Sequence, residues 1–97
     1  MSADTATSER IWEPEESGIR IKVRSIVARV SRIDIVELED DVLIREELGV
    51  DSLMAIEIVA LCEKALEIHI DEEHLFEIQT IGDFIELVFD IHQQKGR

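Results

Sequence analysis

Ser52 has the clearest potential for chemistry in this sequence, because it directly follows Asp51 and precedes an apolar stretch typical of a helix. The first backbone N–H groups of a helix lack partners within the helix, and the helix dipole is positive at that end. A serine placed there could carry an anionic group such as a phosphodiester at little electrostatic cost. Asp and Ser are also good helix caps, and local chemistry alone favours this purely structural role.

A thiol nucleophile is a second possible chemistry, since the chain has one cysteine, Cys62, and three histidines, His69, His74 and His92. Helical spacing places Cys62 on the buried side of its helix, where thiols are usually inert. The histidines do not gather on one helical face, so the sequence predicts no metal site. Paired carboxylates are most simply solvent-exposed charges. We therefore expect no catalytic residue.

The overall charge restricts the partners that this protein can have. The 97 residues carry a formal net charge of −13, from 23 acidic and 10 basic residues. Such a surface repels nucleic acids and anionic membranes and favours basic patches on other proteins. The sequence shows no membrane span and no secretory signal, and its lone cysteine cannot form an internal disulfide. We expect a soluble, cytoplasmic monomer.

Hydrophobic periodicity predicts an all-α fold, a small four-helix bundle with a long first loop and a short third helix. The helices are expected over 18–33, from Ser52 to about Leu66, in a short segment capped by Asp71, and from Thr80 to about Gln93. Thr80 and Asp83 approximate a capping box at the start of the last helix.

The remaining segments are expected to be tails and one functional loop. Residues 1–17 lack periodicity and predict a flexible tail before a domain over 18–93, and residues 94–97 predict a short C-terminal tail. The connection 34–51 is long, and long pinned loops are usually functional. Gly49 permits a positive φ near its end. Four apolar residues are candidates for anchoring this loop to the bundle: Leu38, Val42, Ile44 and Leu48.

Winding the helix after Ser52 at about 100° per residue separates its faces. The core side is expected to hold Ala55, Ile58, Val59, Cys62 and Leu66, and the solvent side Glu57, Glu63, Lys64 and Glu67. Three apolar residues fall on or beside the acidic side instead: Leu53, Ile56 and Ala60. Isolated surface apolar residues are ordinary, but these lie next to Ser52. Their position favours a small docking patch.

A longer pattern surrounds Ser52. The run Glu47-Leu48-Gly49-Val50-Asp51-Ser52-Leu53, followed by Glu57, resembles the phosphopantetheine attachment site of acyl carrier proteins. The resemblance covers nearly all of residues 18–93. It includes the long loop and two later motifs, Ile68-His69-Ile70-Asp71 and Thr80-Ile81-Gly82-Asp83.

The resemblance implies a non-catalytic carrier. A phosphopantetheinyl transferase would attach 4'-phosphopantetheine from coenzyme A to Ser52, and the thiol of that group would carry acyl thioesters. Contacts with the transferase and with acyl-loading, condensing and acyl-transferring enzymes are implied for Asp51, Leu53, Glu57, Ala60 and Ile70. Met54 and Ile56 on the same helix are further candidates for binding these partners. A cavity for the acyl chain is implied among Val59, Cys62, Leu66, Leu75, Ile78 and Phe84.

Two residues depart from the common family pattern. Met54 stands where many fatty-acid carriers have an acidic residue, so the motif is more similar to carriers of polyketide or nonribosomal peptide synthesis than to those of primary fatty-acid synthesis. Asp71 stands where a proline is common, but aspartate can cap the same helix. The alternative from the residues alone is an unmodified acidic helical module that only binds other proteins.

Overall fold

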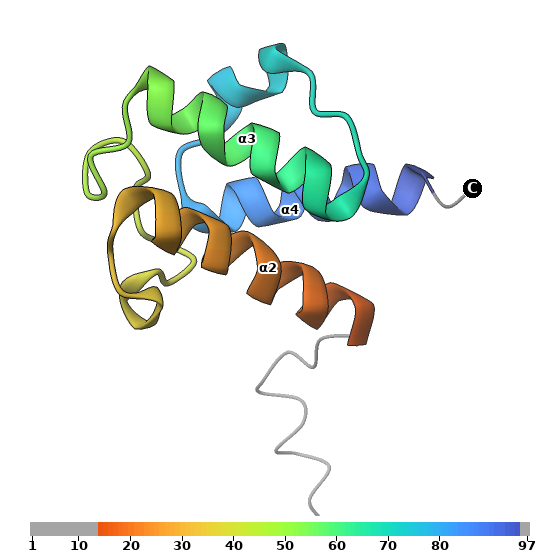
Figure 1. Ribbon diagram of the computed structural model, residues 1–97, viewed down its shortest axis with the longest axis horizontal. Coiled ribbons are helices and arrows are strands. Elements are labelled where there is room, and N and C mark those ends of the chain that lie inside the picture. The colour runs from red at the N-terminus through yellow and green to blue at the C-terminus, as the bar shows by residue number, and fades with distance from the viewer. Residues whose placement is uncertain (1–13, 96–97) are drawn as a thin grey trace, which may run out of the picture.

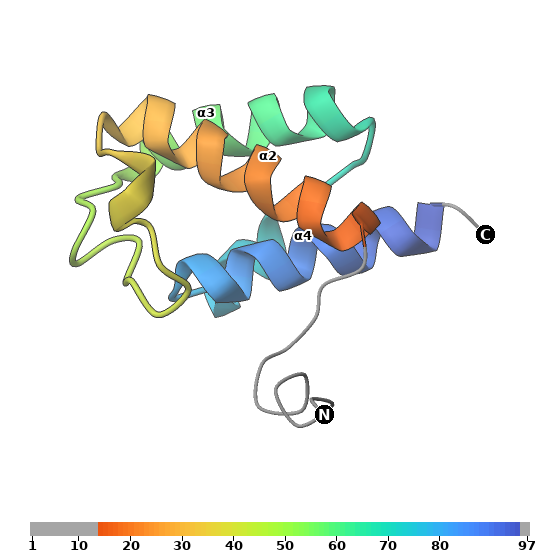
Figure 2. The same cartoon turned by 90° about the horizontal axis from the view of Figure 1, so that it is seen from below.

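The structure of the protein is a computed structural model, of which residues 14–95 are described (Figure 1). Between residues 14 and 95 there are three α-helices, α2 (Pro14–Ser31), α3 (Ser52–Leu66) and α4 (Ile81–Lys95). The segments that join them contain two short 3₁₀-helices, η1 (Ile35–Glu37) and η2 (Glu72–Glu77). The predicted all-α fold with a long first loop and a short third helix is confirmed. Figure 2 shows α3 and α4 on opposite sides of the bundle, with α2 running obliquely between them and its first turn beside α4.

The core lies where the apolar stripes of the three α-helices meet. Its fully buried side chains come from all three helices and from the first loop: Val23, Val27, Leu38, Cys62, Ile81, Ile85 and Val88. Their spacing of three or four residues within each helix places them on one face. The core side predicted for α3 is confirmed, since Ile58, Cys62 and Leu66 are buried and Ala55 and Val59 pack against them. Among the described residues, no helix is long and apolar enough to cross a membrane.

The ends of α2 and α4 differ from the predicted bounds. α2 begins at Pro14 rather than Gly18, so residues 14–17 are helical and do not belong to a tail. Proline suits the first turn of a helix. The negative charges of Glu15 and Glu16 stabilise the same turn, because the helix dipole is positive at that end. α4 extends to Lys95, two residues beyond the expected end. Residues 1–13 and 96–97 of the predicted tails lie outside the described residues.

Side chains near these ends connect all three α-helices. The amide of Gln93 donates to Oε1 of Glu15 at 2.8 Å, which joins the end of α4 to the start of α2. The ammonium group of Lys95 donates to the carbonyl oxygen of Leu66 at 2.9 Å and so satisfies a free carbonyl at the end of α3. The start of α2 and the ends of α3 and α4 therefore lie at one end of the bundle, as Figure 1 shows.

The long first loop is held against the bundle by apolar side chains and by backbone pairing. Leu38 and Leu48 are buried, while Val42 and Ile44 are partly buried against the core, so the predicted anchors are confirmed. The Ile44 N–H donates to the Gln79 carbonyl oxygen at 2.9 Å, and the Ile81 N–H donates to that of Val42 at 3.0 Å. This pairing fixes the loop to the start of α4.

Asp40 in the same loop connects α2 with α4. One guanidinium nitrogen of Arg20 on α2 lies 2.6 Å from both carboxylate oxygens of Asp40. The carbonyl oxygen of Asp40 accepts a hydrogen bond from the Gly82 N–H at 2.8 Å. A Cβ atom at residue 82 would lie only 3.0 Å from that carbonyl oxygen, so the close approach favours glycine.

The start of α4 forms the predicted capping box. The Asp83 N–H donates to Thr80 Oγ1 at 3.0 Å, and Oδ2 of Asp83 accepts from the Thr80 and Gln79 N–H groups at 3.1 and 3.0 Å. Hydrogen bonds from the backbone of Gln79 and Thr80 lower the pKa of Asp83 because they stabilise its ionised form.

Candidate functional site

The start of α3 separates the roles of Asp51 and Ser52. Asp51 caps the helix, since its Oδ1 accepts a hydrogen bond from the Met54 N–H at 2.9 Å. Ser52 is the first residue of α3 and is exposed. Its hydroxyl has no hydrogen-bond partner in the part of the chain that the structure describes. The structural role that the sequence left open for this pair therefore belongs to Asp51, and the Ser52 hydroxyl is available for chemistry.

A rigid turn before α3 fixes the position of Ser52. Gly49 adopts a φ of +70°, as its place in the sequence predicted. Its N–H donates to the Arg45 carbonyl oxygen at 3.1 Å, and the Val50 N–H donates to that of Ile44 at 3.3 Å. Val50 is buried in the core cluster. Buried residues and backbone hydrogen bonds thus hold the serine at the surface.

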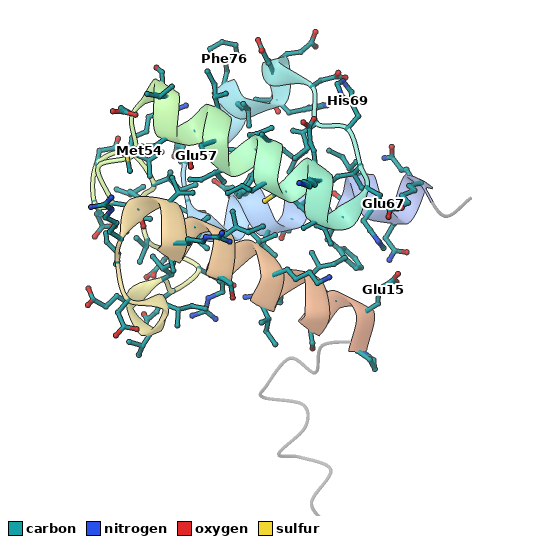
Figure 3. All side chains as sticks on the ribbon, in the orientation of Figure 1. Glu15, Met54, Glu57, Glu67, His69 and Phe76 are labelled. Carbon is teal, nitrogen blue, oxygen red and sulfur yellow. The ribbon has the colours of Figure 1, made fainter. Side chains whose placement is uncertain are left out.

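The predicted apolar patch on α3 is exposed. Leu53 and Ile56 have 74% and 60% of their surface accessible, and Ala60 is also exposed on the same side. Glu57 is exposed beside them, while Met54 is partly buried; both are labelled in Figure 3. Leu53, Ile56 and Glu57 therefore form an exposed surface of two apolar side chains and one carboxylate near the start of α3.

Two residues near this patch differ from the sequence interpretation. Ile70, expected to contact partners, is only 3% exposed and packs in the core, so its side chain is not presented to a partner. Phe76 on η2 was not predicted as a site residue, yet it is 83% exposed (Figure 3). Leu75 and Ile78 face the core, so helical spacing offered a signal that Phe76 points outward.

A pocket of about 730 Å³ lies between α3, η2 and the end of the first loop. Ser52 lines it, together with four of the residues predicted for an acyl cavity: Val59, Leu75, Ile78 and Phe84. The other two predicted residues, Cys62 and Leu66, do not line it. Both are buried in the core cluster, Cys62 because it points from α3 into the bundle interior and Leu66 because it lies at the far end of α3.

The burial of Cys62 bears on its chemistry. Burial, with a smaller contribution from the neighbouring Glu63, raises the pKa of this thiol to about 12. The thiolate is therefore almost absent at neutral pH, and Cys62 cannot act as a nucleophile in this state. Among the described residues, no group of three histidine, cysteine or acidic side chains could hold a metal ion.

The side of the pocket next to η2 carries a polar cluster. The two ring nitrogens of His69 lie 3.4 Å from Glu63 Oε2 and 3.1 Å from Asp71 Oδ1. Glu63 Oε2 also accepts a hydrogen bond from the Ile70 N–H at 2.8 Å. Asp71 precedes η2 but forms no capping hydrogen bond through its side chain, contrary to the prediction, because that side chain contacts His69 instead.

Comparison with known proteins identifies the class to which this fold and site belong. The chain belongs to the family described as phosphopantetheine attachment site, whose family model matches residues 22–88. This match extends from α2 to α4 and includes Ser52. The protein is thus a phosphopantetheine carrier domain, and domains of this family are the sites of covalent 4'-phosphopantetheine attachment.

A similar protein is the non-reducing polyketide synthase dbaI of Emericella nidulans. The two sequences are 33% identical over 75 residues, which make up 77% of this chain and 3% of the synthase. The chain therefore spans only a small fraction of the length of this relative.

Proposed function

We propose that Ser52 carries 4'-phosphopantetheine and that the protein presents acyl groups on it to biosynthetic enzymes. The observation that carries this proposal is the exposed Ser52 hydroxyl, which has no partner among the described residues because Asp51 caps α3. When bound, the group supplies a terminal thiol that forms thioesters with acyl groups. The start of α3 favours the negative charge of a phosphodiester, and the pocket beside Ser52 offers apolar walls to an attached chain.

The protein's own residues provide recognition rather than catalysis in this proposal. The docking surface comprises Asp51, Leu53, Met54, Ile56, Glu57 and Ala60 on and before α3, with Phe76 on η2. Its apolar residues are suited to burial in a partner's pocket, and its carboxylates are suited to a basic rim. The proposed partners are a phosphopantetheinyl transferase and enzymes that load, condense and transfer acyl groups.

We assign the carrier to polyketide or a related specialised acyl synthesis. The similarity to a polyketide synthase supports this choice, and so does Met54 directly after the Asp-Ser-Leu triplet. Charge repulsion at −13 argues against nucleic acid as a partner. The acyl cargo would rest in the pocket or extend beyond it, according to its length and polarity.

The intact mass of the protein tests the proposed attachment. Unmodified protein is incubated with coenzyme A, magnesium and a broad-specificity transferase, and a known carrier in a parallel reaction verifies that the transferase is active. Wild type is expected to gain the mass of one phosphopantetheine, and Ser52→Ala none. Ser25→Ala, which removes an exposed serine on α2, is the matched control and should be modified like wild type.

Two results would contradict the proposal. One is a modified Ser52→Ala protein. The other is an unmodified wild type beside a fully modified control carrier; this would favour the unmodified interaction module.

A further inference from the structure

Arg45 is an isolated cation in the acidic part of the molecule. Between residues 33 and 94 the sequence has only one other lysine or arginine, Lys64. Arg45 is followed by Glu46 and Glu47, yet it forms no ion pair in the part of the chain that the structure describes. The carboxylate of Glu47 instead accepts a hydrogen bond from the Leu43 N–H at 2.7 Å.

The only hydrogen bond of the Arg45 side chain in the described structure is weak. Its guanidinium donates to the Leu75 carbonyl oxygen at 3.4 Å, which is long for an N–H···O bond. A guanidinium has five N–H donors in a planar arrangement, so most of its capacity is unused here. Arg45 is exposed, so its remaining donors face solvent and are free to bind a ligand.

The position of Arg45 links it to Ser52. Both residues line the same pocket, Ser52 at the start of α3 and Arg45 from the preceding loop. The pocket's other basic side chain, His69, already contacts the carboxylates of Glu63 and Asp71. Arg45 is thus the one lining cation that no described carboxylate neutralises. The contact with Leu75 directs its side chain across the pocket wall towards η2.

We propose that Arg45 is a positioning residue that binds an oxyanion of the group carried on Ser52. Arginine suits this role because its planar donors match two oxygens of a phosphate or a carboxylate at once. The oxyanion can come from two sources, the phosphodiester that joins the arm to Ser52 or the carboxylate of a malonyl-type cargo. This inference rests on the proposed attachment at Ser52.

The test follows the Arg45 guanidinium by NMR in protein with ¹⁵N-labelled arginine. Four forms are compared: unmodified protein, protein carrying the bare arm, and protein loaded by the transferase from acetyl- or malonyl-coenzyme A. The ³¹P resonance of the phosphodiester is recorded in parallel. Intact mass first verifies loading on Ser52, so failed attachment is distinguished from an inert Arg45.

A phosphodiester contact predicts that the Arg45 Nε–Hε signal shifts in all three loaded forms and that Arg45→Gln shifts the ³¹P resonance. A cargo contact predicts a shift only in the malonyl form. Either effect should weaken as salt increases. Arg45→Lys keeps the charge without the planar donors and should restore the ³¹P shift only in part.

Lys64→Gln on α3 is the matched control, because it removes the other isolated cation of this part of the chain and lies outside the pocket. It should leave both signals unchanged. The proposal is wrong if correctly loaded protein shows the same Arg45 signal as unmodified protein in every form. Where all three loaded forms shift the Arg45 signal, the proposal is also wrong if Arg45→Gln and Lys64→Gln alter the ³¹P resonance to the same extent.

Discussion

At the scale of single residues, two neighbours at the start of α3 have different tasks. Asp51 satisfies a backbone N–H of the first helical turn, whereas the Ser52 hydroxyl has no partner among the described residues. Removing a capping side chain costs about 1 kcal/mol, while an exposed serine outside the cap contributes little. Stability measurements can therefore separate the structural residue from the one available for modification.

We predict that Asp51→Ala lowers the free energy of unfolding by about 1 kcal/mol, while Ser52→Ala changes it by less than about 0.5 kcal/mol. Asp51→Asn should retain most of the stability, because asparagine also caps helices. Urea unfolding of the unmodified proteins measures all three values. Equal losses for Asp51→Ala and Ser52→Ala would show that the serine shares the capping role.

Cys62 supplies a second prediction at this scale, since burial raises its pKa to about 12 from an ordinary value of 9.0. Between these values the folded chain keeps a proton that the unfolded chain has lost, so stability falls as pH rises through this window. Wild type should lose about 1 kcal/mol more than Cys62→Ala between pH 8 and pH 10. Urea unfolding at both pH values tests this.

Thiol labelling offers a check on the same residue. A thiol reagent should modify Cys62 slowly in folded protein and rapidly in urea. Fast labelling of the folded protein would mean that Cys62 is accessible, in contrast to its complete burial here.

At the scale of elements, the packing of Gly82 against the first loop gives a sharp test. A Cβ at this position would lie 3.0 Å from the Asp40 carbonyl oxygen and 3.2 Å from the Asp40 Cβ, both within a loop held by hydrogen bonds. We expect Gly82→Ala to lower the free energy of unfolding by about 1–3 kcal/mol.

Gly18 is the matched control, because a Cβ there would meet no atom within 4 Å. It lies inside α2, where alanine is favoured over glycine by about 1 kcal/mol, so Gly18→Ala should stabilise the protein. Thermal unfolding of both variants measures the contrast. If Gly82→Ala is as stable as Gly18→Ala, the loop is not packed against α4 as described.

Local signals predicted the helices well and the contacts between distant segments poorly. The bounds of α3 follow from Asp51 and Gly49 before it and from the apolar spacing up to Leu66. The start of α2 was missed because Pro14, Glu15 and Glu16 have the composition of a tail, although each also suits a first helical turn.

Features that depend on tertiary packing had no local signal. The burial of Ile70 and the pairing of Val42 and Ile44 with the start of α4 join residues far apart in the sequence. The exposed patch on α3 was predictable because it depends on the winding of one helix. The absence of Cys62 and Leu66 from the pocket lining was not predictable, because the extent of the pocket depends on where η2 covers α3.

At the scale of the whole molecule, charge is divided between two regions. α2 and the residue after it carry five basic side chains, Arg20, Lys22, Arg24, Arg29 and Arg32, against the two acidic ones Glu15 and Glu16. The α3 and η2 surface is predominantly acidic. Long-range attraction should therefore orient a basic partner towards α3 before contact, and this orientation should weaken with salt.

We predict that Glu57→Lys slows modification by the transferase about tenfold at low salt, because it reverses a charge at the centre of the proposed docking surface. Glu86→Lys makes the same change on an exposed position of α4 and should slow it much less. Initial rates from intact mass at several salt concentrations test this. Equal slowing by both variants would show that only net charge matters.

The hydrogen bond between Gln93 and Glu15 places the end of α4 beside the start of α2. Polypeptide joined before α2 or after α4 would leave from the same end of the bundle, while Ser52 lies at the opposite end of α3, a helix about 22 Å long (Figure 1). A flexible linker attached at that end would let the whole domain rotate about its point of attachment. The end of the domain that holds Ser52 would then move through the widest range of positions. Enzymes placed within that range could be reached one after another without a change in the bundle itself.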